Sequence, residues 1–191
     1  MLKSNTKRIK GYLTNINYLI LFFAINSCQD NYQNCLDLEY GTEYIKITGV
    51  SESDKNYFKY FCKTSEVFGI KIYATENVDN DKILHAASIL AQYLDNDEDG
   101  EPDNQEVLTK LQDANAIMVM WDDDTNVLDP IVELPPGTTV LQDVGAIETH
   151  PEWHFSGYQD IPQNQDGGYD ASLEEVFHLI TEGYILQYPS V

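Results

Sequence analysis

The stretch from Asp95 to Glu106 is the feature that most restricts how this chain can fold. It reads Asp-Asn-Asp-Glu-Asp-Gly-Glu-Pro-Asp-Asn-Gln-Glu, so seven of its twelve residues are acidic. Counted from Asp95, carboxylates stand at positions 1, 3, 5, 9 and 12, and Gly100 stands at position 6. Side chains that alternate in this way can converge on one point, and a glycine allows the sharp bend that this requires. The spacing therefore predicts a tight loop built around a cation.

This segment closely resembles the EF-hand calcium loop over all twelve positions. Calcium takes six to eight hard oxygen ligands at about 2.3–2.6 Å. The resemblance implies the following ligands: Asp95, Asp97, Asp99, the backbone carbonyl of Glu101, Asp103 and a bidentate Glu106. Position 8 departs from the pattern, because Pro102 has no N–H to pair with a second loop. We expect one solitary, structural calcium site; the alternative is a solvated acidic turn.

Both flanks of this loop have the hydrophobic periodicity of helices. An amphipathic helix over residues 82–94 is predicted by apolar residues at helical spacing, namely Ile83, Ala87, Leu90 and Leu94. A shorter helix after the loop is predicted by Val107, Leu108 and Leu111. The whole unit is therefore expected to be helix, loop, helix.

The first 27 residues have the pattern of an export signal, with a basic start followed by an apolar run from Tyr18 to Ile25. That run is too short to span a bilayer as a helix. The sequence Ile25-Asn-Ser-Cys28 resembles the lipobox of bacterial lipoproteins, which implies cleavage before Cys28 and acylation of its thiol. Multiple acyl chains would anchor the mature protein to a membrane of the cell envelope. The alternative is an ordinary signal with an incidental cysteine.

Charge and composition limit the classes of function. The formal net charge is −21, and the predicted signal contains 4 of the 11 basic residues, which leaves 7 basic against 32 acidic residues. Such a surface repels phosphate backbones, so nucleic-acid binding is not expected. A hydrophobic content of 42% and 13 tyrosines are typical of a globular chain. Cys35 and Cys62 either form a disulfide or are two separately buried thiols.

The remaining patterns predict one α+β domain. Strands are expected at residues 43–48, 67–74 and 138–141, and the apolar run over 116–121 predicts a central buried strand. The expected organisation is a signal peptide over 1–27, a tether over 28–37 and a globular domain over 38–191. We expect a mixed or antiparallel sheet, the helix-loop-helix calcium unit and a C-terminal helix. The sequence ends soon after that helix, and we allow that the domain is truncated there.

A second group of polar residues lies near the C-terminus. Residues 172–184 are expected to be helical, with Ser172 and Glu175 as a capping box. Its expected apolar stripe comprises Leu173, Val176, Phe177, Ile180 and Tyr184. A zinc site would use the opposite face of this helix and two loop histidines: Glu174, His178, Glu182, His150 and His154. Glu175 is then the candidate general base. The Glu-Glu-x-x-His pattern resembles a zincin motif only loosely, and a solvated helix face is the simpler interpretation.

Two hypotheses for function follow. The first is a calcium-binding exported lipoprotein of the bacterial cell envelope, in which calcium is structural and the domain is a binding or structural module. The alternative is a metal-dependent (zinc) hydrolase or peptidase-like enzyme that uses His178 and nearby Glu and His side chains. The membrane is the expected partner through the lipid anchor, and the sequence identifies no protein or glycan partner.

Overall fold

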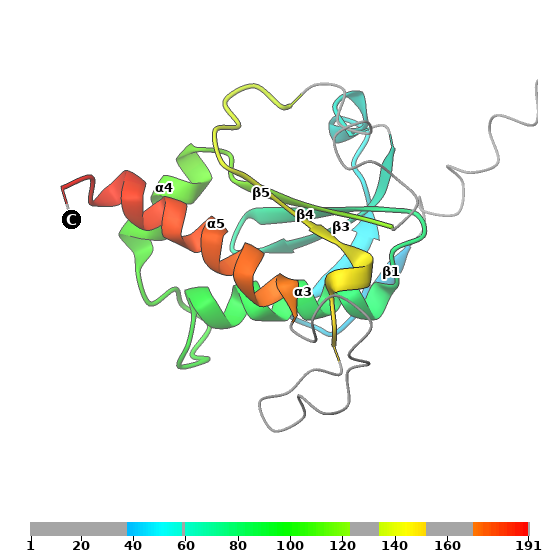
Figure 1. The fold of residues 1–191 in the computed structure, drawn as a ribbon, viewed down its shortest axis with the longest axis horizontal. Helices are drawn as coiled ribbons and strands as arrows, with labels where there is room; N and C mark the ends of the chain where they lie inside the picture. Colours follow the sequence, from blue (N-terminus) through cyan, green and yellow to red (C-terminus); the bar gives the residue numbers. More distant parts are fainter. Residues whose placement is uncertain (1–37, 59, 123–133, 152–169, 191) are drawn as a thin grey trace, which may run out of the picture. The chain divides into compact units, whose positions relative to one another are not determined.

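A six-stranded mixed sheet organises the residues that the structure, a computed structural model, describes: 38–58, 60–122, 134–151 and 170–190. The strands lie side by side in chain order (Figure 1): β1 (Glu39–Gly41), β2 (Lys46–Gly49), β3 (Phe61–Val67), β4 (Ile70–Thr75), β5 (Ile117–Trp121) and β6 (Leu141–Gly145). Strands β1 to β4 are antiparallel to one another, whereas β4, β5 and β6 are parallel. All described residues belong to one unit, Cys35–Val191, and the predicted single α+β domain with a mixed sheet is confirmed.

Three helices pack on one face of this sheet: α3 (Asn80–Leu94), α4 (Gln105–Asp113) and α5 (Ala171–Gln187). Strand residues Ile72, Met118 and Met120 join the buried faces of these helices in one continuous hydrophobic core. The crossover from β4 to the parallel strand β5 contains α3, the acidic loop and α4. The predicted helices on both sides of the loop are therefore confirmed, with α3 beginning at Asn80 rather than Lys82.

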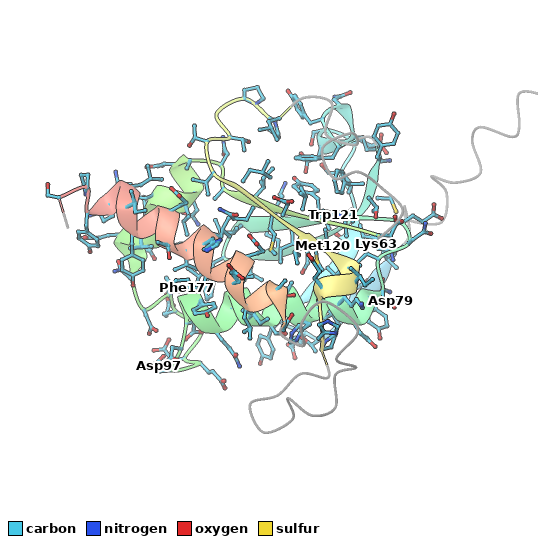
Figure 2. The ribbon with its side chains drawn as sticks, in the orientation of Figure 1. Lys63, Asp79, Asp97, Met120, Trp121 and Phe177 are labelled. Carbon is cyan, nitrogen blue, oxygen red and sulfur yellow. The ribbon has the colours of Figure 1, made fainter. Side chains whose placement is uncertain are left out.

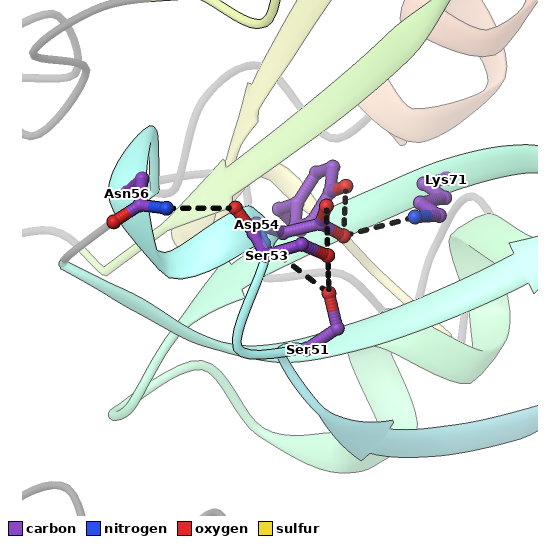
Figure 3. A network of polar contacts seen from close by, with 6 residues as sticks. Ser51, Ser53, Asp54, Asn56 and Lys71 are labelled. Atoms are coloured by element: carbon purple, nitrogen blue, oxygen red, sulfur yellow. Dashed lines mark hydrogen bonds and ion pairs between the residues drawn. The ribbon is translucent and has the colours of Figure 1, made fainter.

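The other face of the sheet has a smaller core and a polar network. Phe58 and Tyr73 stack there with ring centroids 4.0 Å apart, in a cluster with Phe61, Ile117 and Val119. A short 3-10 helix, η2 (Asp54–Asn56), approaches the same face. The Asp54 carboxylate accepts hydrogen bonds from Lys71 Nζ at 2.9 Å and from Tyr73 Oη at 3.0 Å (Figure 3). These bonds attach the segment before β3 to the sheet.

The Asp54 network is electrostatically satisfied. Burial disfavours the charged form of Asp54, but the hydrogen bonds from Lys71 and Tyr73 outweigh this effect and hold its pKa below the usual range. Burial and the neighbouring Asp54 raise the pKa of Tyr73, so the phenol stays protonated and remains a donor. The network therefore stabilises the fold at neutral pH.

Two sequence-based strands were wrongly placed, and a third, expected over 43–48, forms only from Lys46 to Gly49 as β2. Residues 67–74 were expected to form one strand, but Phe68 and Gly69 form the turn between β3 and β4, with φ of +49° and +81°. A positive φ is uncommon for a residue as bulky as Phe68, which is why the pattern did not indicate a turn there. The last strand begins at Leu141, where the expected strand over 138–141 ends. The continuous buried strand β5 is confirmed, and it lies between β4 and β6.

The buried side of α5 also differs from the expected stripe. Phe177 and Tyr184 are 52% and 45% exposed, whereas Leu179 and Gly183 are buried. A Cβ atom on Gly183 would lie 2.7 Å from Leu111 Cγ and 3.0 Å from Val107 Cγ1. The absence of a Cβ atom at Gly183 lets Leu111 and Val107 of α4 pack closely against this side of α5.

Candidate functional site: the acidic loop after α3

The acidic loop is closed by hydrogen bonds between its own residues. Asp95 directly follows α3 and is only 9% exposed; its Oδ1 accepts from Asp99 N at 3.1 Å and its Oδ2 from Gly100 N at 2.9 Å. Gly100 has a φ of +89°, and a Cβ atom there would meet nothing within 4 Å. Gly100 is therefore needed for its positive φ, as its position in the loop predicts, and not for close packing with a neighbour.

The exit of the loop is equally well defined. Asp103 Oδ2 accepts from Asn96 N at 2.9 Å, and Asp103 N donates to Leu94 O at 2.8 Å. Asn104 caps α4 by accepting from Val107 N. These contacts bring the end of α3 and the start of α4 together.

Three of the predicted ligands come together in this loop. Asp95, Asp97 and Asp99 each place a carboxylate oxygen within 4.8 Å of the others, and no other such group of three or more His, Cys, Asp or Glu side chains occurs among the described residues. Asp97 lies on the outer side of the loop (Figure 2). The negative charge of Asp99 raises the pKa of Asp97, an effect that a bound cation would reverse. This donor set of clustered hard oxygens fits calcium.

The other three predicted ligand residues lie outside this group. Asp103 accepts from the Asn96 backbone, and Glu101 is exposed. Glu106 accepts two hydrogen bonds through Oε2, from Gln187 Nε2 at 2.9 Å and Tyr188 Oη at 3.3 Å. The residue expected to complete the shell is thus held by the C-terminal end of α5, a contact that the loop sequence could not indicate.

The predicted zinc residues do not form one cluster among the described residues. His178 is half exposed on α5, with Nε2 3.9 Å from Glu174 Oε1 and Nδ1 3.6 Å from Glu175 Oε2. Burial raises the pKa of Glu175; His178 opposes this rise, whereas Asp143 and Glu174 add to it. Glu182 is partly exposed on the same helix, and His150 is buried in a different segment. His154 lies outside the described residues, so the zinc set stays a prediction from sequence.

Sequence reasoning missed a buried His–Asp pair. His85 Nε2 on α3 lies 2.6 Å from the Oδ2 atom of Asp170, whose side chain is fully buried. Asp170 Oδ1 accepts from Ser172 N and His150 N, so Asp170, and not Ser172, is the N-cap of α5. Burial disfavours the charged form of Asp170, but the hydrogen bond and charge of His85 lower its pKa below the usual range. The pair joins α5 to α3 and explains why the expected capping box is wrong.

The features predicted near the N-terminus lie mostly outside the described residues. This applies to the signal over 1–27, the lipidation residue Cys28, the tether and Cys35. Cys62, at the start of β3, is disulfide-bonded. Its pairing with Cys35 stays a prediction. Within the described part of the chain, none of the helices has the length and apolar composition needed to cross a membrane.

Comparison with known protein families, with curated proteins and with solved structures finds no match for this chain.

Proposed function

We propose that this protein is a calcium-binding exported lipoprotein of the bacterial cell envelope, and that calcium stabilises its structure. One observation carries the calcium part: carboxylate oxygens of Asp95, Asp97 and Asp99 lie within 4.8 Å of one another in a loop between two helices. Three anionic oxygens this close repel one another, and a divalent cation among them converts this repulsion into attraction.

The remaining ligands lie near this group in the chain. The resemblance assigns a backbone carbonyl to Glu101 and carboxylates to Asp103 and Glu106, which would bring the oxygen count into the range that calcium prefers. Glu106 lies at the start of α4, whereas Asp95 directly follows α3. A cation held by both residues would join the two helices of the β4–β5 crossover. Calcium in this position would stabilise the folded domain, and this structural role needs no catalytic residue.

Export and anchoring are supported by the sequence alone. Cys28, which follows the apolar run that ends at Ile25, provides the lipidation site, and the described residues begin ten positions later at Leu38. An acyl anchor places the acidic domain beside a membrane without a membrane-spanning helix. The domain would then act as a calcium-stabilised binding or structural module at that surface.

The calcium proposal is tested on the soluble domain with Asp97→Ala, which removes the ligand oxygen, and, as a matched control, Glu98→Ala. Both substitutions remove one charge from the same loop, but only Asp97 stands at a ligand position. Calcium at about 100 times its Kd would add about 2.7 kcal/mol to the free energy of unfolding, or roughly 5–10 °C in Tm. We expect this rise for the wild type and Glu98→Ala, and its loss in Asp97→Ala. Equal Tm values for the wild type in calcium and in chelator would refute the proposal.

Anchoring is tested separately with Cys28→Ser in the full chain. We expect the wild type to incorporate labelled fatty acid and to fractionate with membranes, and the variant to do neither. A wild-type protein that takes up no label would contradict the lipoprotein assignment while leaving the calcium proposal intact.

A further inference from the structure

The C-terminal turn of α5, residues 184–188, has little buried surface. Gly183, which directly precedes it, is the last buried residue of the helix and packs against Leu111 of α4. The large apolar side chains of the turn are between 39% and 54% exposed, namely Tyr184, Ile185, Leu186 and Tyr188. A segment with so few buried apolar contacts opens at a low cost in free energy. Burial therefore does little to hold this turn in place.

Two hydrogen bonds attach the C-terminal turn to α4. Gln187 Nε2 and Tyr188 Oη both donate to the Oε2 atom of Glu106, at 2.9 Å and 3.3 Å. Among the described residues, no other side-chain hydrogen bond joins this turn to another element. Within the turn, Tyr188 N donates to Tyr184 O at 2.8 Å. The Glu106 carboxylate is therefore the main polar attachment of the turn.

Glu106 also belongs to the acidic loop. It stands at position 12, where the resemblance assigns both of its carboxylate oxygens to calcium. An ionised carboxylate has about four lone-pair sites on its two oxygens, so each oxygen accepts about two hydrogen bonds. The donors of α5 already supply two to Oε2. Calcium and the C-terminal turn of α5 therefore compete for the same atom.

We propose that calcium binding releases the C-terminal turn of α5, so that this turn is a conformational switch controlled by the acidic loop. The inference rests on the proposed calcium site. Coupling between two contacts is reciprocal, so hydrogen bonds that weaken calcium binding are themselves weakened by calcium. Only the turn responds, because the contact of Gly183 with α4 does not involve Glu106. Release of the turn exposes its four large apolar side chains further.

The test measures amide hydrogen exchange by mass spectrometry on the purified full chain, in calcium and in chelator at equal ionic strength. Peptides that cover residues 184–190 report on the turn. We expect calcium to speed exchange of the turn roughly fivefold, the factor that corresponds to two hydrogen bonds at the surface. Peptides from the acidic loop should exchange more slowly in calcium, because a bound ligand stabilises the folded loop.

The variant Gln187→Ala/Tyr188→Phe removes both donors to Glu106. In chelator its turn should exchange roughly fivefold faster than that of the wild type, and calcium should not change this rate. Gln105→Ala is the matched control, because Gln105 lies beside Glu106 but its side chain donates to Thr109 Oγ1. We expect the turn of this control to respond to calcium like the wild type. Thermal melts establish that each variant is folded.

Calorimetric calcium titration of the same samples separates this proposal from the proposed function. A wild type that binds calcium without faster exchange of the turn would overturn the switch and leave the proposed function intact. A calcium response that persists in the double variant would also overturn it, because the hydrogen bonds to Glu106 could not then be its cause. A wild type that binds no calcium would overturn the proposed function and the switch together.

Discussion

Glu106 is the predicted ligand at which calcium would compete with hydrogen bonds of the protein itself. Its Oε2 atom accepts from Gln187 Nε2 at 2.9 Å and from Tyr188 Oη at 3.3 Å. A bidentate contact from Glu106 to calcium would engage Oε2, the same atom that accepts from these two donors, so the donors and the cation compete for it. Removing the donors with Gln187→Ala/Tyr188→Phe should therefore tighten calcium binding, although neither residue is a ligand.

The size of this effect follows from the two hydrogen bonds. Each is worth about 0.5–1.5 kcal/mol net, and the surface position of all three side chains favours the lower end. We take about 1 kcal/mol for the pair, which corresponds to a roughly fivefold lower Kd for calcium. The same bonds stabilise the position of α5, so the variant should lose about 1 kcal/mol of unfolding free energy in chelator.

Calcium titration by calorimetry at fixed pH and ionic strength measures the change. Gln105→Ala is the control, because Gln105 lies beside Glu106 but its side chain donates to Thr109 Oγ1. We expect the control to bind calcium like the wild type. A double variant with unchanged or weaker affinity would refute the competition while leaving calcium binding in place. A wild type that binds no calcium would refute the proposed function itself.

Three further predictions follow from single contacts. The calcium-induced rise in Tm should be largest near neutral pH. It should shrink as pH falls towards the raised pKa of Asp97, because a protonated carboxyl is a poor calcium ligand. Thermal melts with and without calcium across pH check this, and a rise that is constant down to acidic pH would contradict it. Asp170→Ala should lower the free energy of unfolding at pH 7 by about 3 kcal/mol in urea titrations, because it leaves His85 without its buried partner. The folded-state pKa of Asp170 is lowered, so this contribution is present above the ordinary Asp pKa and is lost as pH falls through the folded pKa. A decrease in the free energy of unfolding of less than about 1 kcal/mol would contradict the role given to the pair. Gly183→Ala should cost about 1–3 kcal/mol, because its Cβ atom would lie 2.7 Å from Leu111 Cγ; the same urea titration checks it, and a neutral substitution would show that α4 and α5 separate easily.

Patterns within short stretches of the sequence predicted the helix α3, the buried strand β5 and the bend of the acidic loop. The periodic residues Ile83, Leu90 and Leu94 are buried in α3, and the apolar run over 116–121 is the buried strand β5. Gly100 adopts the positive φ that its position in the loop requires. In these cases each residue's environment is determined by neighbours within one or two turns of the chain.

Contacts between distant segments were not predictable in this way. The N-cap of α5 is Asp170, whose carboxylate is hydrogen-bonded to His85, a residue 85 positions earlier in the chain. Gly183 packs closely against Leu111, and the Glu106 carboxylate accepts a hydrogen bond from Gln187. Both contacts join residues that are far apart in the sequence. A single sequence does not indicate which distant segments meet, so such contacts escape any pattern of fixed spacing.

The domain has few basic residues with which to balance its many acidic residues. Seven basic residues follow Cys28, all of them lysines, and five have specific contacts among the described residues: Lys46 with Glu39, Lys55 with Glu52, Lys71 with Asp54, and Lys63 and Lys82 with backbone carbonyls of Val78 and Ala146. None of these contacts involves the acidic loop. The negative charge of this loop therefore attracts cations from solution. Calcium is suited to the clustered carboxylates of Asp95, Asp97 and Asp99 because it prefers several hard oxygen ligands.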